Sequence, residues 1–193
     1  MHTIEQALNV TKSLTKTYDC IVLQLITNDI RHHSVDEVIC MLEQLIGVCK
    51  SKSQEQIISL APERLDSSDL NYAVKWVNDA IRVRFKDHES VFTCSHDNLC
   101  HQGQPNQSLY MYDKFHLTKQ GSGRMYANIK NVVRECIHRR RQQQQSIYQP
   151  NRSATELDNM GSQRRANPVY HGLKTSQIQN IPPRMLSNTF CSY

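Results

Sequence analysis

The sequence predicts an α/β fold, in which a parallel sheet is covered by helices on both faces. Short apolar runs alternate along the chain with longer stretches whose apolar residues recur at helical spacing. The connections between successive runs are long enough to hold a helix, as right-handed crossovers between parallel strands require. Ligands bind at the carboxyl ends of such strands, so we expect chemistry just after Ile26, Leu60 and Thr93.

Four helices are expected, over about residues 3–16, 34–49, 67–81 and 118–139. The first two begin with capping boxes, in which a hydroxyl residue and a Gln or Glu three residues later each bind the other's backbone N–H group: Thr3 with Gln6, and Ser34 with Glu37. The third helix begins at Ser67 or Ser68, either of which can cap it.

Three strands are expected between these helices, at Cys20–Ile26, Gln56–Leu60 and Ser90–Thr93. The first is almost continuously apolar, as is typical of a parallel strand that is buried on both faces. A polar loop over about residues 95–115 separates the third strand from the last helix. The expected order is therefore helix and strand in alternation three times, then a loop and a final helix.

The charge and composition of the chain divide it into two parts. The formal net charge is +5. Residues 1–140 carry 17 Lys and Arg against 16 Asp and Glu, whereas residues 141–193 carry 6 against 2 and are rich in Gln, Asn, Ser and Pro. We therefore expect a folded domain over residues 1–139 and a disordered basic tail over residues 140–193. A solvated tail is the simpler interpretation, and weak binding of nucleic acid is the alternative.

The cysteines and the apolar runs predict a reducing, cytoplasmic location. The seven cysteines are an odd number and are scattered along the chain. The segment Met1–Lys12 lacks the apolar stretch of a signal peptide, and the run Ile21–Ile26 is too short to span a bilayer. No membrane span, metal or cofactor is therefore expected. The alternative is a zinc site in one clustered set, although its spacing is unlike that of paired zinc ligands: Cys94, His96, Cys100 and His101.

Two short motifs contain candidate catalytic residues. Asn28 and Asp29 follow the first expected strand directly, where an asparagine amide can donate a hydrogen bond to a developing oxyanion. Asp113 and His116 are three residues apart, so the carboxylate can bind one imidazole nitrogen while the other faces a cleft. Taken singly, the first motif is also typical of a helix cap, and the second of a surface histidine.

Together these motifs resemble conserved blocks of the SGNH (GDSL-like) hydrolases. The stretch Tyr18–Asp29 is similar to the third block, a strand leading into Gly-x-Asn-Asp, and Asp113-Lys-Phe-His116 with Leu117, Thr118 and Gly121 is similar to the fifth. The Ile58–Pro62 stretch and a following helix with Asn71 and Asn78 also fit. The resemblance covers about residues 1–138, and is greatest to SGNH domains in animal proteins associated with mobile elements.

The resemblance implies a three-layer α/β/α, flavodoxin-like fold and hydrolysis of ester bonds without a metal. Asn28 matches the family's oxyanion-hole asparagine, His116 its general base, and Asp113 the acid that orients the base. The implied substrates are esters, such as acylated small molecules or carbohydrates.

The sequence departs from the family at the nucleophile. The 27 residues ahead of Asn28 contain no glycine, so the Gly-Asp-Ser block with the catalytic serine and the second-block glycine have no match. Ile26 stands where the third block has glycine, and no serine lies on a sharp strand-to-helix turn, although three were considered: Ser34, Ser59 and Ser95. We therefore expect an N-terminally truncated domain without its first strand, a serine esterase by descent that is inactive. The alternative is a non-catalytic interaction module or a mobile-element fragment.

Overall fold

A computed structural model describes residues 3–147 of the chain, and all structural statements below concern those residues. The main helices are α1 (Ile4–Ser13), α2 (Val35–Cys49), α3 (Ser68–Phe85) and α4 (Lys119–Ile147). The strands are β1 (Tyr18–Gln24), β2 (Ser53–Ser59), β3 (Val91–Cys94), β4 (Cys100–His101) and β5 (Gln104–Pro105). Three short 3-10 helices connect them: η1 (Asp29–Arg31), η2 (Asp97–Leu99) and η3 (Gln107–Leu109).

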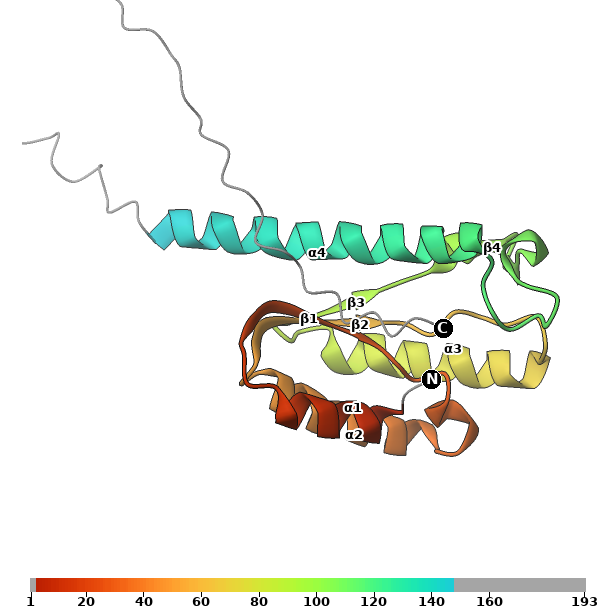
Figure 1. The fold of residues 1–193 in the computed structure, drawn as a ribbon, viewed down its shortest axis with the longest axis horizontal. Helices are drawn as coiled ribbons and strands as arrows, with labels where there is room; N and C mark the ends of the chain where they lie inside the picture. Colours follow the sequence, from red (N-terminus) through yellow and green to blue (C-terminus); the bar gives the residue numbers. More distant parts are fainter. Residues whose placement is uncertain (1–2, 148–193) are drawn as a thin grey trace, which may run out of the picture. The chain divides into compact units, whose positions relative to one another are not determined.

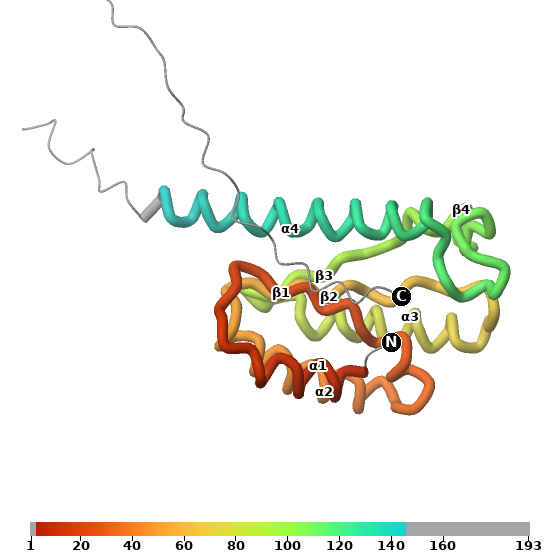
Figure 2. Tube along the Cα trace, viewed as in Figure 1, coloured from red at the N-terminus to blue at the C-terminus, as the bar shows by residue number. Residues whose placement is uncertain are grey.

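A parallel sheet lies between two layers of helix, which confirms the predicted fold class. Its described strands are in the order β1-β2-β3, with Leu23 beside Ile58 and Ile58 beside Thr93. The helices α1, α2 and α3 cover one face, and α4 covers the other (Figure 1). Along the layer of three, α1 lies beside α2 and α2 beside α3 (Figure 2).

The alternation of side chains along β2 divides the apolar core into two parts. Ile58 is buried in the larger cluster, which contains residues of α1, α2 and α3. Its neighbour Ile57 points to the opposite face and packs in a smaller cluster with Cys94 and Cys136 of α4. Both isoleucines are fully buried, as expected for a strand with helices on each side. The two clusters hold the three layers together.

The helix starts agree with the sequence predictions, whereas two later features differ from them. Both capping boxes form, and Ser67 caps α3. The last helix continues to Ile147 instead of ending near Arg139, because Arg and Gln favour helix and Arg140 bonds to Asp19 at 3.2 Å. The loop after β3 contains the β4–β5 hairpin, which turns at Gln102 and Gly103 in left-handed conformations.

Part of the predicted tail, residues 148–193, lies outside the described residues. No helix between residues 3 and 147 is long and apolar enough to cross a lipid bilayer.

Gly121, in the first turn of α4, is expected not to tolerate a side chain. A Cβ atom there would overlap the backbone oxygen of Leu109 and lie 3.1 Å from Cδ2 of Leu117. Since the Leu109 oxygen already accepts the Thr118 N–H, the backbone has to shift. We expect Gly121→Ala to lower the free energy of unfolding by about 2 kcal/mol, measured by urea denaturation.

The matched control is Gly123→Ala, two residues further along α4. A Cβ atom at Gly123 meets nothing within 4 Å. This substitution is expected to stabilise the protein by up to about 1 kcal/mol, because alanine favours helix over glycine. Equal stabilisation by both substitutions would contradict the close approach of Gly121 to Leu109.

Candidate active site

Asn28 lies in the loop that follows β1, at the carboxyl edge of the sheet. It immediately precedes η1, with helical dihedral angles (φ −81°, ψ −37°), and its side chain makes no capping hydrogen bond to that helix. The Asn28 amide therefore does not cap the helix, which was the alternative role considered for it. The amide stands at the strand end where a hydrogen-bond donor to a substrate is expected.

Asp29, the next residue, has a structural role that the sequence did not reveal. Its side chain is buried, with 2% of its surface exposed. Both carboxylate oxygens accept the backbone N–H of Ile4, at 3.1 and 3.3 Å. Because the first N–H groups of a helix lack internal partners and carry partial positive charge, Asp29 anchors the start of α1. This contact ties the Asn28 loop to the helical layer.

Ile26 occupies a backbone conformation that favours glycine. Its φ is +86°, and its side chain is fully buried in the larger core cluster. A β-branched residue at positive φ is strained, typically by about 1–3 kcal/mol. Its carbonyl oxygen accepts the N–H of Ile30 at 3.0 Å, which closes the turn into η1. The turn before Asn28 therefore has the backbone form that a glycine would adopt more easily.

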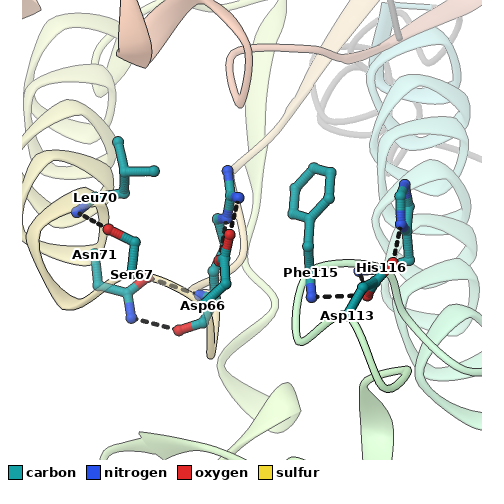
Figure 3. Close-up of polar contacts among 8 residues, drawn as sticks. Asp66, Ser67, Leu70, Asn71, Asp113, Phe115 and His116 are labelled. Carbon is teal, nitrogen blue, oxygen red and sulfur yellow. Dashed lines mark hydrogen bonds and ion pairs between the residues drawn. The ribbon is translucent and has the colours of Figure 1, made fainter.

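Asp113 and His116 form a hydrogen-bonded pair in the loop before α4 (Figure 3). Imidazole Nδ1 lies 2.6 Å from Oδ2 of Asp113, while Oδ1 accepts the N–H groups of Phe115 and His116 at 3.0 and 2.9 Å. The hydrogen bond from His116, followed by those from the two backbone N–H groups, lowers the pKa of Asp113 to about 2.

The ionised Asp113 carboxylate determines what His116 can do chemically. A carboxylate only accepts hydrogen bonds, so it selects the imidazole tautomer with the proton on Nδ1. Nε2 of neutral His116 is then the basic nitrogen. The imidazole side chain of this pair is 47% exposed, so it lies at the surface of the domain. The pair has the arrangement of a base and the acid that orients it.

Two asparagines of α3 hold the loop that follows β2. Asn78 bonds both backbone groups of Ala61, through Oδ1 at 3.1 Å and Nδ2 at 2.9 Å. Asn71 bonds both backbone groups of Arg64 in the same way, at 2.7 and 2.6 Å. Seven helical residues rise about 10.5 Å, and three extended residues span about 10 Å, so the two clamps match. The Ala61–Arg64 segment is thereby fixed along α3.

The clamped segment in turn supports the loop of the Asp113–His116 pair. The Leu65 N–H donates to the Lys114 carbonyl at 3.0 Å, and the Tyr110 hydroxyl donates to the Glu63 carbonyl. Lys114 itself has a left-handed backbone (φ +60°), which turns the chain between Asp113 and His116. The pair is therefore held by its own turn and by the β2 loop.

The Asn28 loop also interacts electrostatically with the β2 loop. Arg31 of η1 contributes to lowering the pKa of Asp66, after the larger effect of Arg64, which donates hydrogen bonds to the Asp66 carboxylate. The loops after β1 and β2 therefore lie within electrostatic range of each other at Asp66. The loop before α4 contacts the β2 loop directly, at the Glu63–Leu65 segment.

Ser59, one of the three serines considered as nucleophile, pairs with a different histidine. Its hydroxyl is buried at the end of β2, and Oγ lies 2.8 Å from Nε2 of His96. Asn128 of α4 directs Nδ2 at the other ring nitrogen, Nδ1, at 3.2 Å. Nδ1 is therefore the acceptor, and Nε2 carries the proton and donates to Ser59. In this tautomer His96 cannot take a proton from Ser59.

The other two serines also lack the geometry of an activated nucleophile. Ser34 caps α2, and its hydroxyl is bonded to Glu37. The Oγ atom of Ser95 is buried and has no hydrogen-bond partner, so no base contacts it. A serine nucleophile needs a base within hydrogen-bonding reach.

The residues considered for zinc do not converge. Cys94 is buried in the cluster with α4, where burial raises the pKa of its thiol to about 11, and His96 binds Ser59 and Asn128. Between residues 3 and 147, no three His, Cys, Asp or Glu side chains are grouped closely enough to hold a metal ion.

Comparison with solved structures finds the same fold in bacterial proteins. One is a Streptococcus pneumonia protein described as a platelet activating factor, with a TM-score of 0.57, 23% identity, and coverage of 68% of each chain. Another is a member of the lipolytic protein G-D-S-L family from Veillonella parvula DSM 2008, with a TM-score of 0.52 and 21% identity, covering 67% of this chain and 71% of that one. No protein-family profile matches this chain. No curated protein sequence matches it either.

Proposed function

We propose that this chain is an SGNH-type hydrolase-like protein, a serine ester hydrolase by descent that lacks a nucleophile and is inactive by itself. The Asp113–His116 pair carries this proposal, since its hydrogen bond of 2.6 Å and its position before α4 are what a base and its orienting acid require. The lipolytic G-D-S-L neighbour, which shares the fold, supports it. The resemblance of Tyr18–Asp29 and of Asp113–Gly121 to SGNH sequence blocks supports it further.

Three residues would each have a role in ester hydrolysis. His116 would accept a proton through Nε2, Asp113 would stabilise the resulting imidazolium, and Asn28 would donate to the oxyanion of an ester carbonyl. Acylated small molecules and carbohydrates are the proposed substrate class. Among residues 3–147, none of the three serines considered as nucleophile supplies the attacking hydroxyl, because Ser59 and Ser34 are engaged in other hydrogen bonds and Ser95 has no base beside it.

A fluorophosphonate probe tests the proposed inactivity, because it labels only serines that a base has activated. We expect no labelling of the full chain at pH 7–8. Labelling that disappears in His116→Ala but persists in His101→Ala, a change of an exposed histidine on the β4–β5 hairpin, would show that the chain is catalytic. That result would overturn the proposed inactivity and would strengthen the assignment of His116 as base.

The alternative function, binding of nucleic acid through the basic tail, depends mainly on residues 148–193, which lie outside the described structure. No contact among the described residues favours it over the proposal above.

A further inference from the structure

Arg64 is a buried cation between the β2 loop and the loop of His116. Only 4% of its side chain is exposed. Because arginine is rarely buried without a partner, this burial requires one. Its partner is Asp66, since Nε donates to Oδ1 at 2.7 Å and the terminal nitrogen NH2 donates to Oδ2. Such a two-point pair satisfies part of the guanidinium and fixes its plane. A charge buried in this way has a defined orientation.

The Arg64 guanidinium lies over the ring of Phe115. Its central carbon lies 3.9 Å from the centroid of the Phe115 ring, which is within the range of a strong cation–π contact. The Phe115 ring lies beside the His116 imidazole, with ring centroids 4.6 Å apart and planes tilted by 55°. Figure 3 shows Phe115 between Asp66 and His116. Three planar groups therefore follow one another from the β2 loop to the imidazole.

The two ends of this series differ in how firmly they are held. The backbone of Arg64 is clamped on both sides by Asn71. The Asp113–His116 turn, by contrast, is partly exposed and includes the left-handed Lys114. The imidazole is bonded to Asp113 through Nδ1, and the Phe115 ring packs beside it. The clamped arginine therefore contacts, through Phe115, a histidine that is more exposed than itself.

We propose that Arg64 is a positioning residue for His116, acting through the ring of Phe115 to keep the imidazole aligned with the Asp113 carboxylate. This inference rests on the proposed function, in which His116 is the base. Arg64 is assigned no part in the chemical step itself. Its planar guanidinium is essential to the role, because lysine cannot pair with Asp66 at two points and stack on Phe115 at the same time.

The test is NMR of the histidine-labelled full chain. We expect Arg64→Met to reduce the Phe115 ring-current shifts of the His116 ring protons, and to speed solvent exchange of the His116 Nδ1–H about tenfold, a factor that loss of a desolvated cation–π contact accounts for. Arg64→Lys is expected to change the ring-current shifts and the Nδ1–H exchange rate in the same way as Arg64→Met. The matched control is Arg82→Met, which removes an α3 arginine paired with Asp79, and it should leave His116 unchanged.

A second variant keeps the inference testable if Arg64→Met fails to fold. Phe115→Leu removes the intermediate ring and leaves the Arg64–Asp66 pair in place. It should accelerate Nδ1–H exchange to the same extent, and combining it with Arg64→Met should add nothing. Unchanged exchange in both single variants, or additive effects in the double variant, would overturn the role of Arg64. Because this measurement needs no turnover, its failure would contradict the role of Arg64 and would leave the esterase proposal untouched.

Discussion

Ile26→Ala is expected to lower the free energy of unfolding by about 3 kcal/mol, and Ile26→Gly is expected to be no more destabilising. The alanine change removes a fully buried aliphatic side chain from the core, for which about 2–5 kcal/mol is usual. Glycine removes one more carbon, but it adopts the φ of +86° without strain. The strain that alanine retains is thus absent in the glycine variant.

Elsewhere in the core, glycine is normally the worse of the two replacements. The matched control is Ile58, which is also fully buried in the larger cluster but lies in the regular strand β2. There Ile58→Gly should be less stable than Ile58→Ala by about 0.5–1 kcal/mol. Urea denaturation of the four variants gives both differences. If glycine is the worse replacement at Ile26 by the same margin, then Ile26 is not strained.

Acid is expected to destabilise the protein through His96 as the pH falls from 6.5 to 4. Burial lowers the pKa of His96 to about 4, from an ordinary 6.5, against a small opposing effect of Asp97. Above pH 6.5 the histidine is neutral in the folded and unfolded chains, so its contribution to stability is fully present. Between pH 6.5 and 4 only the unfolded chain takes up the proton, and stability falls as the pH falls.

The expected loss from His96 is about 3 kcal/mol by pH 4, at 1.36 kcal/mol for each pH unit. The groups bonded to its ring nitrogens, Ser59 and Asn128, are neutral, and the charge of Asp97 offsets only part of the effect of burial. His88 also has a pKa lowered by burial, so it adds to the slope in the same direction. The decisive quantity is therefore the difference between wild type and His96→Gln.

Urea denaturation at several pH values between 7 and 4 measures that difference. His96→Gln should lose about 3 kcal/mol less than wild type over this range, whatever its stability at pH 7. The control His101→Gln changes an exposed histidine of the β4–β5 hairpin and should follow the wild-type profile. Parallel profiles for wild type and His96→Gln would mean that His96 is not buried as a neutral ring.

The fold was predictable because local signals agree with one another along most of the chain. Capping boxes at Thr3 and Ser34 mark helix starts through contacts only three residues long, and the sequence therefore contains the whole interaction. Apolar runs located the strands. The burial of β1 on both faces was predicted wrongly, because β1 is an end strand of the described sheet: only Leu23 is buried and Val22 is 37% exposed. The end of α4 was not predictable in this way, since a Gln and Arg run supports a helix without any apolar period.

The site was predictable only where its contacts are local or where a family resemblance names the residues. Asp113 and His116 are three residues apart, so their spacing alone suggests a hydrogen bond. Asp29 binds Ile4, and His96 binds Ser59, across much longer separations that no sequence period encodes. The placement of Arg64 against Phe115 belongs to the same class. Such contacts depend on the packed layers, and only the structure reveals them.

The paired clamps of Asn71 and Asn78 have a consequence for how this domain can vary in length. Because two helical turns are matched to three extended residues, inserting or deleting one residue between Ala61 and Arg64 would leave at least one amide without its partners. Insertions after Asp66 and before Ser67 lie outside the matched span. Homologous chains that keep both asparagines should therefore keep the Ala61–Arg64 spacing. Their length can vary beyond Asp66.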